Sequence, residues 1–262
     1  MDHSQELSFA KNLAHEAGKV MLKYFNSNNL SLELKPNITP LTLADTEINN
    51  LVIKTINEKY PAHTIIGEEG NGGVENSEYE WICDPIDGTV PYSLSIPHSF
   101  FSLALYKNKK PLFGILYNPM MNIFLEAIEG GNALMNGKVT RVKGGQIEKG
   151  DTVAFVNHRG TKSNVDHTKI MSYFIQNDVF VIADVCNTFL AALMVMGKIK
   201  CAFVTPAHVW DRAAVSIILR ATGGKMLSPS GEVENIFEKP EKYIIYTNGD
   251  VDDFTQKLAK NN

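Results

Sequence analysis

The sequence predicts a layered fold with mixed sheets, in which an α+β first half is joined to an α/β second half. Three observations lead to this prediction. Two helical patterns come first, strands that look antiparallel follow, and strands and helices then alternate to the end of the 262-residue chain. Such elements bury their apolar faces by packing as layers. We place the division near residues 143–150, which gives a first domain at 1–145 and a second at 146–262.

The first half opens with two helices. Apolar residues at steps of three and four predict the first helix, with Ser4 as its N-cap. The second helix is expected from about Ala44 to Tyr60, where Pro61 ends it. The period then changes to that of strands, which we expect at 63–67, 80–84, 99–106, 111–117 and 122–128. Asn136-Gly137 predicts a hairpin between two further strands.

The second half alternates between the two periods. Strands are expected at 153–156, 179–183, 200–204 and 243–247. Helices are expected from about Asn164, over 188–197, over 210–224 with glycine closing the helix, and from about Asp250. This alternation is typical of an α/β arrangement.

The composition indicates an ordinary globular protein and excludes several classes. Hydrophobic residues make up 44% and charged residues 21% of the chain, unlike disordered or collagen-like chains. The net charge of −4 makes nucleic acid an unlikely partner, and the longest apolar run, 189–196, is too short to cross a membrane. Cys83, Cys186 and Cys201 are widely spaced and odd in number, and the N-terminus has no signal core. We therefore expect a cytoplasmic protein.

One acidic stretch stands out from this average. From Tyr60 to Tyr106 the chain has no Lys or Arg but seven Asp or Glu. Within it, Asp84 ends an apolar strand, Pro85 takes the chain out of the ladder, and 87–89 form a turn into a helix. Carboxylates with few nitrogen or sulfur donors favour a hard cation such as Mg²⁺, and free amides at a helix start bind phosphate. The segment predicts a metal-assisted phosphate site, with a solvated acidic turn as the alternative.

Three motifs resemble the signatures of the inositol monophosphatase family. They are Gly67-Glu68-Glu69, Asp84-Pro85-Ile86-Asp87-Gly88-Thr89 and Trp210-Asp211-Arg212-Ala213-Ala214. The resemblance covers nearly the whole chain. It implies the αβαβα layers of sugar phosphatases, a homodimer, and a lithium-sensitive phosphatase with two or three Mg²⁺ per site. Its reaction would be hydrolysis of a small phosphorylated alcohol by metal-activated water.

The resemblance also implies a role for individual residues. The implied metal ligands are Glu68, Asp84, the Ile86 carbonyl, Asp87 and Asp211. The implied catalytic pair is Asp45 and Thr89, which would orient and deprotonate the attacking water. The implied phosphate contacts are the Gly88 and Thr89 amides, and the implied substrate contacts are Asn187, Thr188 and His208. Cys83 should face away from the site, because neighbouring strand residues point to opposite sides.

The chain departs from the family pattern at positions that would contact the alcohol part of the substrate. Val185-Cys186-Asn187-Thr188 replaces a Gly-Ser/Thr-Ala-Ala run, and Val204 stands where the family often has an acid. These departures count against inositol as the alcohol. Inositol monophosphate is the first substrate candidate that the resemblance implies, with histidinol phosphate, fructose 1,6-bisphosphate and adenosine 3′,5′-bisphosphate as alternatives. A regulatory member of the fold that binds protein or RNA is the alternative of another class.

Five further residues are weaker candidates for substrate contact. Each has a plainer interpretation as a core, loop or solvated side chain: Lys35, His98, His158, Arg159 and Lys162.

Overall fold

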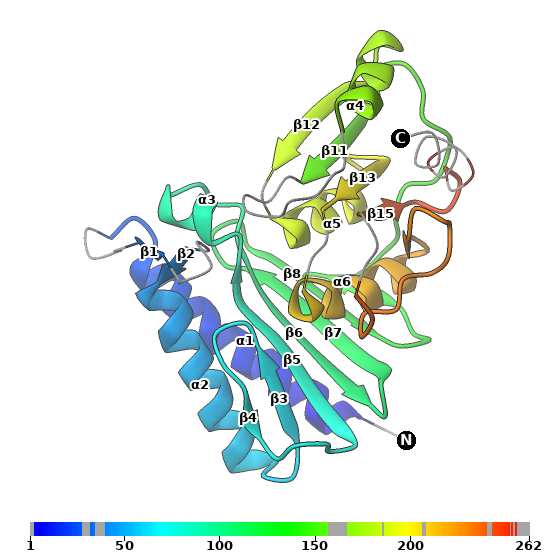
Figure 1. Ribbon diagram of the computed structural model, residues 1–262. Coiled ribbons are helices and arrows are strands. Elements are labelled where there is room, and N and C mark those ends of the chain that lie inside the picture. Colours follow the sequence, from blue (N-terminus) through cyan, green and yellow to red (C-terminus); the bar gives the residue numbers. More distant parts are fainter. Residues whose placement is uncertain are drawn as a thin grey trace.

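The computed structural model describes residues 3–27, 32–34, 40–156, 167–184, 186–205, 208–239, 243–251, 253 and 255. Within these ranges, helices and two large sheets stack as alternating layers (Figure 1). The layered class with mixed sheets that the sequence predicts is therefore confirmed.

The larger sheet has eight strands in the order β10-β9-β8-β7-β6-β5-β3-β4. Its pairs are antiparallel except that β3 and β5 run parallel. The strands are β3 (Thr64–Gly67), β4 (Gly72–Gly73), β5 (Tyr79–Asp87), β6 (Phe100–Lys107), β7 (Lys110–Asn118), β8 (Ile123–Ile128), β9 (Ala133–Met135) and β10 (Lys138–Thr140). Two short strands, β1 (Leu32–Leu34) and β2 (Pro40–Thr42), pair separately.

The smaller sheet has five strands in the order β12-β11-β13-β15-β14. β12, β11 and β13 run parallel, and β15 and β14 complete the sheet in antiparallel pairs. The strands are β11 (Thr152–Val156), β12 (Phe180–Asp184), β13 (Cys201–Val204), β14 (Lys225–Leu227) and β15 (Ile244–Thr247). The six helices of the described ranges are α1 (Ser4–Tyr24), α2 (Leu43–Lys59), α3 (Thr89–Ser93), α4 (His167–Gln176), α5 (Asn187–Val195) and α6 (Val209–Thr222).

Three hydrophobic cores hold the layers together. α1 and α2 pack on one face of the larger sheet, where Trp81 and Cys83 are buried. Ile82, between them in sequence, points to the other face and joins the core formed with α5, α6 and the smaller sheet. A third core lies between the far side of the smaller sheet and α4. The alternation along β5 thus confirms that Cys83 faces away from the side where α6 packs.

Most predicted elements are present, with differences at their ends. The hairpin is confirmed, because Asn136 and Gly137 both have positive φ and their flanking residues pair. The prediction of Ser4 as N-cap is wrong by one residue, since His3 holds that position and α1 begins at Ser4. No sequence pattern predicted the short strands β1, β2, β4 and β14. The last helix, expected from about Asp250, falls mostly on residues outside the described ranges. None of the helices described is both long and apolar enough to cross a bilayer.

Candidate metal and phosphate site

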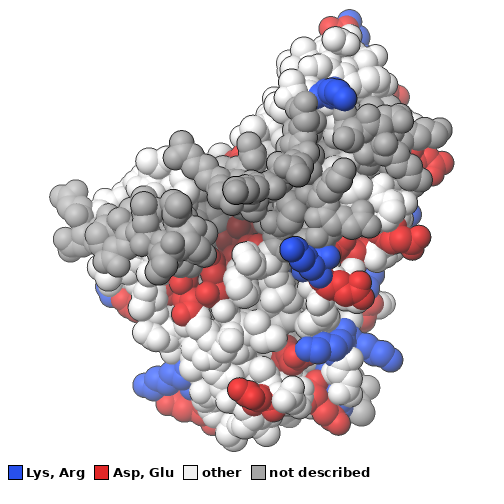
Figure 2. Space-filling model, in the orientation of Figure 1, with Lys and Arg blue, Asp and Glu red and all other residues white. Residues whose placement is uncertain are grey.

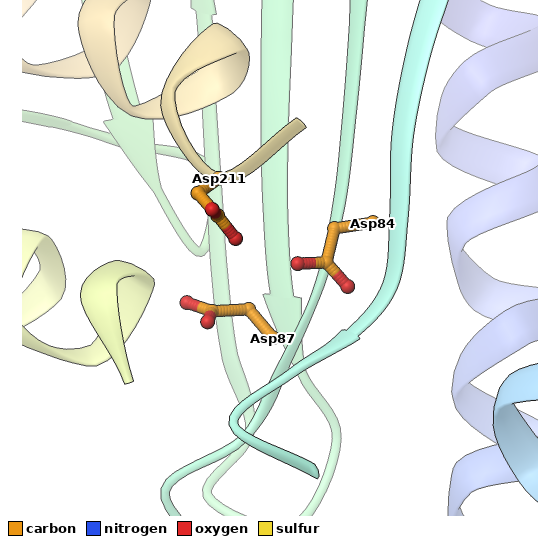
Figure 3. Close-up of side chains that lie close together, drawn as sticks. All are labelled: Asp84, Asp87 and Asp211. Carbon is orange, nitrogen blue, oxygen red and sulfur yellow. The ribbon is translucent and has the colours of Figure 1, made fainter. Parts of the chain in front are cut away.

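Three carboxylates from two distant parts of the chain converge beside the larger sheet. Asp84 and Asp87 come from the end of β5, and Asp211 comes from the first turn of α6. One carboxylate oxygen of each lies within 4.8 Å of the others. Figure 3 shows the three side chains directed into a common space. On the face seen in Figure 2, acidic side chains are visible in the hollow at its middle.

An irregularity in β5 brings Asp84 and Asp87 to the same side. Asp84 pairs with Ser102 and Asp87 with Phe100, so three steps along β5 match two steps along β6. Residues three apart on a regular strand face opposite sides, and the extra residue of a bulge corrects this. The expectation that the strand ends at Asp84 is therefore wrong. The strand continues to Asp87, and the irregularity accommodates Pro85.

The electrostatics of this cluster favour a cation. Burial, followed by the nearby charges of Glu68 and Asp87, raises the pKa of Asp84 well above its usual range. Burial and then the charges of Asp87 and Glu68 do the same to the pKa of Asp211. Two like charges about 4 Å apart repel by roughly 4 kcal/mol at an effective dielectric near 20. A divalent cation removes that repulsion, and oxygen donors alone suit a hard one.

Glu68 and Ile86 lie next to the cluster. Glu68 follows β3, and its backbone N–H donates to the Cys83 carbonyl at 3.2 Å. Its charge reaches Asp84 and Asp211, although it is not part of the group of three within 4.8 Å. The Ile86 amide donates to Asp84 Oδ1 at 3.0 Å, and the Ile86 carbonyl accepts the Thr89 hydroxyl at 3.2 Å.

Asp45 is held at the start of α2, facing Thr89. Its Oδ2 accepts the Thr42 amide at 2.8 Å and the Thr42 hydroxyl at 2.5 Å. Its Oδ1 lies 3.5 Å from Thr89 Oγ1. Burial raises the pKa of Asp45 to about 7, against the lowering effect of the Thr42 hydrogen bonds. A carboxyl with such a pKa can exchange a proton near neutral pH.

Gly88 forms the turn between the cluster and α3. Its φ of 84° lies in the left-handed region, and it is the N-cap of α3. A Cβ added there would lie 3.0 Å from the Cβ and 3.1 Å from the Sγ of Cys186. Both the backbone and the space therefore require glycine at this position. The Gly88 and Thr89 amides stand at the start of α3, as the sequence predicts.

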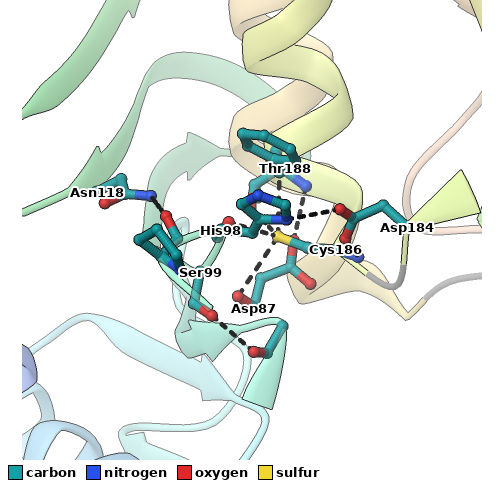
Figure 4. A network of polar contacts seen from close by, with 10 residues as sticks. Asp87, His98, Ser99, Asn118, Asp184, Cys186 and Thr188 are labelled. Atoms are coloured by element: carbon teal, nitrogen blue, oxygen red, sulfur yellow. Dashed lines mark hydrogen bonds and ion pairs between the residues drawn. The ribbon is translucent and has the colours of Figure 1, made fainter. Parts of the chain in front are cut away.

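The first turn of α5 fixes the carboxylate of Asp87 (Figure 4). Asp87 Oδ2 accepts the Thr188 amide at 2.6 Å, and the Cys186 thiol lies 3.3 Å from the same oxygen. Cys186 also caps α5, because its Sγ accepts the Phe189 amide. In the sequence, Cys186 stands out only as a departure from the family pattern, and no pattern there predicts its contact with Asp87.

A second polar pair lies beside that turn. His98 Nδ1 is 2.8 Å from Asp184 Oδ2, and the His98 ring stacks on Phe189 with centroids 4.0 Å apart. Asp184 also accepts the Cys186 amide at 3.1 Å. The pair connects the loop after α3 with the end of β12 (Figure 4). No sequence signal pointed to Asp184.

The predicted substrate residues have different surroundings. Asn187 is fully buried, and neither polar atom of its side chain has a hydrogen-bond partner among the described residues. The Thr188 hydroxyl lies 3.2 Å from Cys186 Sγ. His208 is exposed and stacks on Trp210, while its amide donates to Asp211 Oδ2 at 2.6 Å.

Val204 is buried in the core formed with α5, α6 and the smaller sheet. Four candidates lie outside the described residues: Lys35, His158, Arg159 and Lys162.

Comparison with known proteins gives the same class of protein. A model of the inositol monophosphatase family matches residues 2–261. An inositol monophosphatase of Dictyostelium discoideum is 30% identical over 241 residues, which cover 87% of this chain and 86% of the relative. A protein named Nus factor SuhB, from Pasteurella multocida, is 29% identical over 86% of this chain and 85% of its own length. The structure of a Thermotoga maritima IMPase has a TM-score of 0.86 at 25% identity, covering 98% of this chain and 97% of that one.

The fold, the acidic site and these matches together define a phosphomonoesterase. The chain belongs to the inositol monophosphatase family.

Proposed function

We propose that the chain hydrolyses the phosphate ester of a small alcohol resembling inositol monophosphate and that the reaction depends on Mg²⁺. The convergence of Asp84, Asp87 and Asp211 beside Asp45 and Thr89 carries this proposal. Inositol monophosphatase is the name of several relatives, which supports the substrate class.

The carboxylate cluster fits Mg²⁺ because it offers only oxygen donors and is strained by its own charge without a cation. Asp84, Asp87 and Asp211 would hold the metal, and Glu68 and the Ile86 carbonyl would complete the set for two or three ions. Bound there, Mg²⁺ supplies positive charge that stabilises the phosphoryl oxygens and the leaving oxygen.

Asp45 and Thr89 activate the attacking water. The Thr89 hydroxyl, between Asp45 Oδ1 and the Ile86 carbonyl, orients the water, and Asp45 draws off its proton. The water oxygen bonds to phosphorus while the bond from phosphorus to the alcohol oxygen breaks. The departing alkoxide takes a proton from solvent water, and Asp45 returns its own proton to solvent, which restores the site. The Gly88 and Thr89 amides bind the phosphoryl oxygens at the start of α3.

Asn187, Thr188 and His208 would contact the alcohol part of the substrate. Asn187 supports this role, because a buried amide without a partner is satisfied when a hydroxyl-bearing ligand binds. The start of α5 and Val204 differ from the family pattern at positions that would contact the alcohol. Three other substrates therefore remain candidates: histidinol phosphate, fructose 1,6-bisphosphate and adenosine 3′,5′-bisphosphate.

Phosphate release from a panel of these four esters tests the proposal. We expect release from one ester that requires Mg²⁺, disappears with a chelator and falls when lithium is added. Folded protein that releases phosphate from none of the esters at saturating Mg²⁺ would contradict the substrate class.

A regulatory role is a second candidate, because relatives named Nus factor SuhB match most of the chain. In that case the chain would bind a protein or RNA partner while keeping the acidic site. Binding of RNA or of a partner protein that persists in a variant without phosphatase activity would support it.

We also propose a cytoplasmic homodimer. β12 is an edge strand of the smaller sheet, and Phe180 on it is 66% exposed. An edge strand with an exposed aromatic residue is a suitable surface for an isologous contact. The three cysteines are free and buried, as suits a reducing compartment. Sedimentation of the chain and of a Phe180→Glu variant tests the dimer, which the charge should dissociate.

A further inference from the structure

Arg212, next to Asp211 in sequence, is buried under the first turn of α6. Its side chain is 3% exposed and forms a 2.7 Å ion pair with Glu234, whose side chain is 6% exposed. Burying a guanidinium costs much solvation free energy. The hydrogen-bond partners of Arg212 therefore indicate what this residue does.

All five N–H donors of the guanidinium are used. One group of bonds goes to the segment after β14, which returns across α6. That group comprises Glu234 Oε1 and the carbonyls of Asn235 at 3.4 Å, Ile236 at 2.8 Å and Glu238 at 3.0 Å. The remaining donor, Nε, points back to the His208 carbonyl at 3.2 Å.

His208 connects Arg212 to the acidic site. It is the N-cap of α6, and its amide donates to Asp211 Oδ2 at 2.6 Å. Arg212 therefore holds the carbonyl of the residue whose N–H holds the Asp211 carboxylate. The two contacts lie on the two peptide groups that flank the Cα of His208. The backbone orientation at His208 therefore affects the direction of the Asp211 side chain.

We propose that Arg212 is a positioning residue for the metal site, which holds Asp211 in place for a divalent cation through His208. The inference rests on the proposed metal site and adds the segment 234–238 as its support. A planar fork with five donors is needed for this, because it reaches the two groups of acceptors from one rigid plane. A lysine keeps the charge but does not reproduce the fork.

Mn²⁺ binding, followed by electron paramagnetic resonance without substrate, separates this role from simple anchoring of the segment. Arg212→Lys should weaken Mn²⁺ binding by about tenfold, since a supporting partner of a metal ligand contributes ten- to a hundredfold. The matched control is Tyr106→Phe, which removes a buried 3.0 Å hydrogen bond to Ala213 on the same helix. The control should lower the melting temperature and leave Mn²⁺ binding unchanged.

Unchanged Mn²⁺ binding by Arg212→Lys, with only a lower melting temperature, would overturn the proposal and make Arg212 an anchor of the segment alone. If Arg212→Lys does not fold, Glu234→Gln replaces it. That variant keeps the shape but removes the ion pair that orients the fork, and it should weaken Mn²⁺ binding several-fold; unchanged binding would overturn the proposal equally. If the unaltered chain binds no Mn²⁺, the proposed metal site itself fails, which is a distinct result.

Discussion

The backbone N–H of Thr188 donates to Asp87 Oδ2 at 2.6 Å, although the two residues are 101 positions apart. Asp87 belongs to the larger sheet and Thr188 to the first turn of α5, which packs between the sheets. The orientation of one carboxylate of the acidic site is therefore set by a helix from the second half of the chain. The site is complete only when both halves are packed together.

Asp87→Asn should abolish turnover while leaving the fold intact. The amide oxygen of Asn can still accept the Thr188 N–H, so the contact between the halves survives, but the charge for the metal is lost. We expect the rate to fall by more than about a hundredfold, since even the partners of metal ligands contribute ten- to a hundredfold. Phosphate release and circular dichroism measure the two effects.

Glu75→Gln is the matched control, because Glu75 lies in the same acidic stretch but is exposed. Its activity should equal that of the unaltered chain. Activity retained by Asp87→Asn would remove Asp87 from the proposed ligand set.

Much of the site was predictable because its residues lie in short motifs. Asp84, Asp87 and Gly88 occur within five residues of chain, where local geometry limits the arrangement, and a carboxylate oxygen of Asp211 lies within 4.8 Å of one from Asp84 and one from Asp87. The bulge was not predictable, because Pro85 favours an end to the ladder and only the pairing with β6 shows that the strand continues.

The polar pairs that surround the acidic site could not be predicted, for a different reason. His98 with Asp184, and Arg212 with Glu234, are pairs between distant segments. A single sequence shows the charge of each partner but not which ones meet. In the sequence, Arg212 is one residue of the motif at 210–214, and nothing there predicts that it is buried. Its burial depends on how the segment 234–238 folds back over α6.

Gly88→Ala should unfold the turn that carries the site. The φ of 84° disfavours any residue with a Cβ, and the added Cβ would lie 3.0 Å from that of Cys186. We expect a loss of about 2 kcal/mol or more in the free energy of unfolding, from strain and overpacking together, with a parallel loss of activity. Urea denaturation measures the first effect.

Gly137→Ala is the control for that substitution. Gly137 also has positive φ, 77°, but an added Cβ would meet nothing within 4 Å. It should cost about 1 kcal/mol from strain alone and leave phosphate release unchanged. Equal losses in the two variants would show that the contact with Cys186 contributes nothing.

The stability of the metal-free protein should fall as the pH rises towards 7. The pKa of Asp45 is about 7 in the folded chain, against an ordinary value of 3.8. Between these values Asp45 holds a proton in the folded state that the unfolded state has released. The contribution of Asp45 to stability is therefore lost as the pH rises through this window and is constant above it. The loss from Asp45 alone is on the order of 4 kcal/mol as an upper bound.

Added Mg²⁺ should act in the opposite sense. The metal requires ionised carboxylates, and the pKa values of Asp84 and Asp211 are raised, so stabilisation by Mg²⁺ grows with pH. Melting temperatures from pH 5.5 to 8.5, with chelator and with Mg²⁺, test both trends. Asp45→Asn should reduce the slope of the chelator curve, and the raised pKa values of Asp84 and Asp211 account for the slope that remains. A melting temperature that rises with pH in the presence of chelator would contradict this account.

Asn187→Ala should weaken substrate binding without destabilising the protein. The side-chain amide is fully buried and has no hydrogen-bond partner among the described residues, so its removal relieves a desolvation penalty. We expect the free energy of unfolding to stay the same or rise by up to about 1 kcal/mol. If the amide binds a hydroxyl of the substrate, KM rises about three- to tenfold, the equivalent of a hydrogen bond worth about 1 kcal/mol.

Asn57→Ala provides the comparison for Asn187. Asn57 Oδ1 is also buried without a partner among the described residues, but it lies in the last turns of α2, at the opposite end of that helix from Asp45. Its removal should leave KM unchanged. Steady-state kinetics on the preferred ester, beside urea denaturation of both variants, separates the two cases. A KM for Asn187→Ala equal to that of Asn57→Ala would show that Asn187 does not contact the substrate. The alcohol would then be recognised through Thr188 and His208.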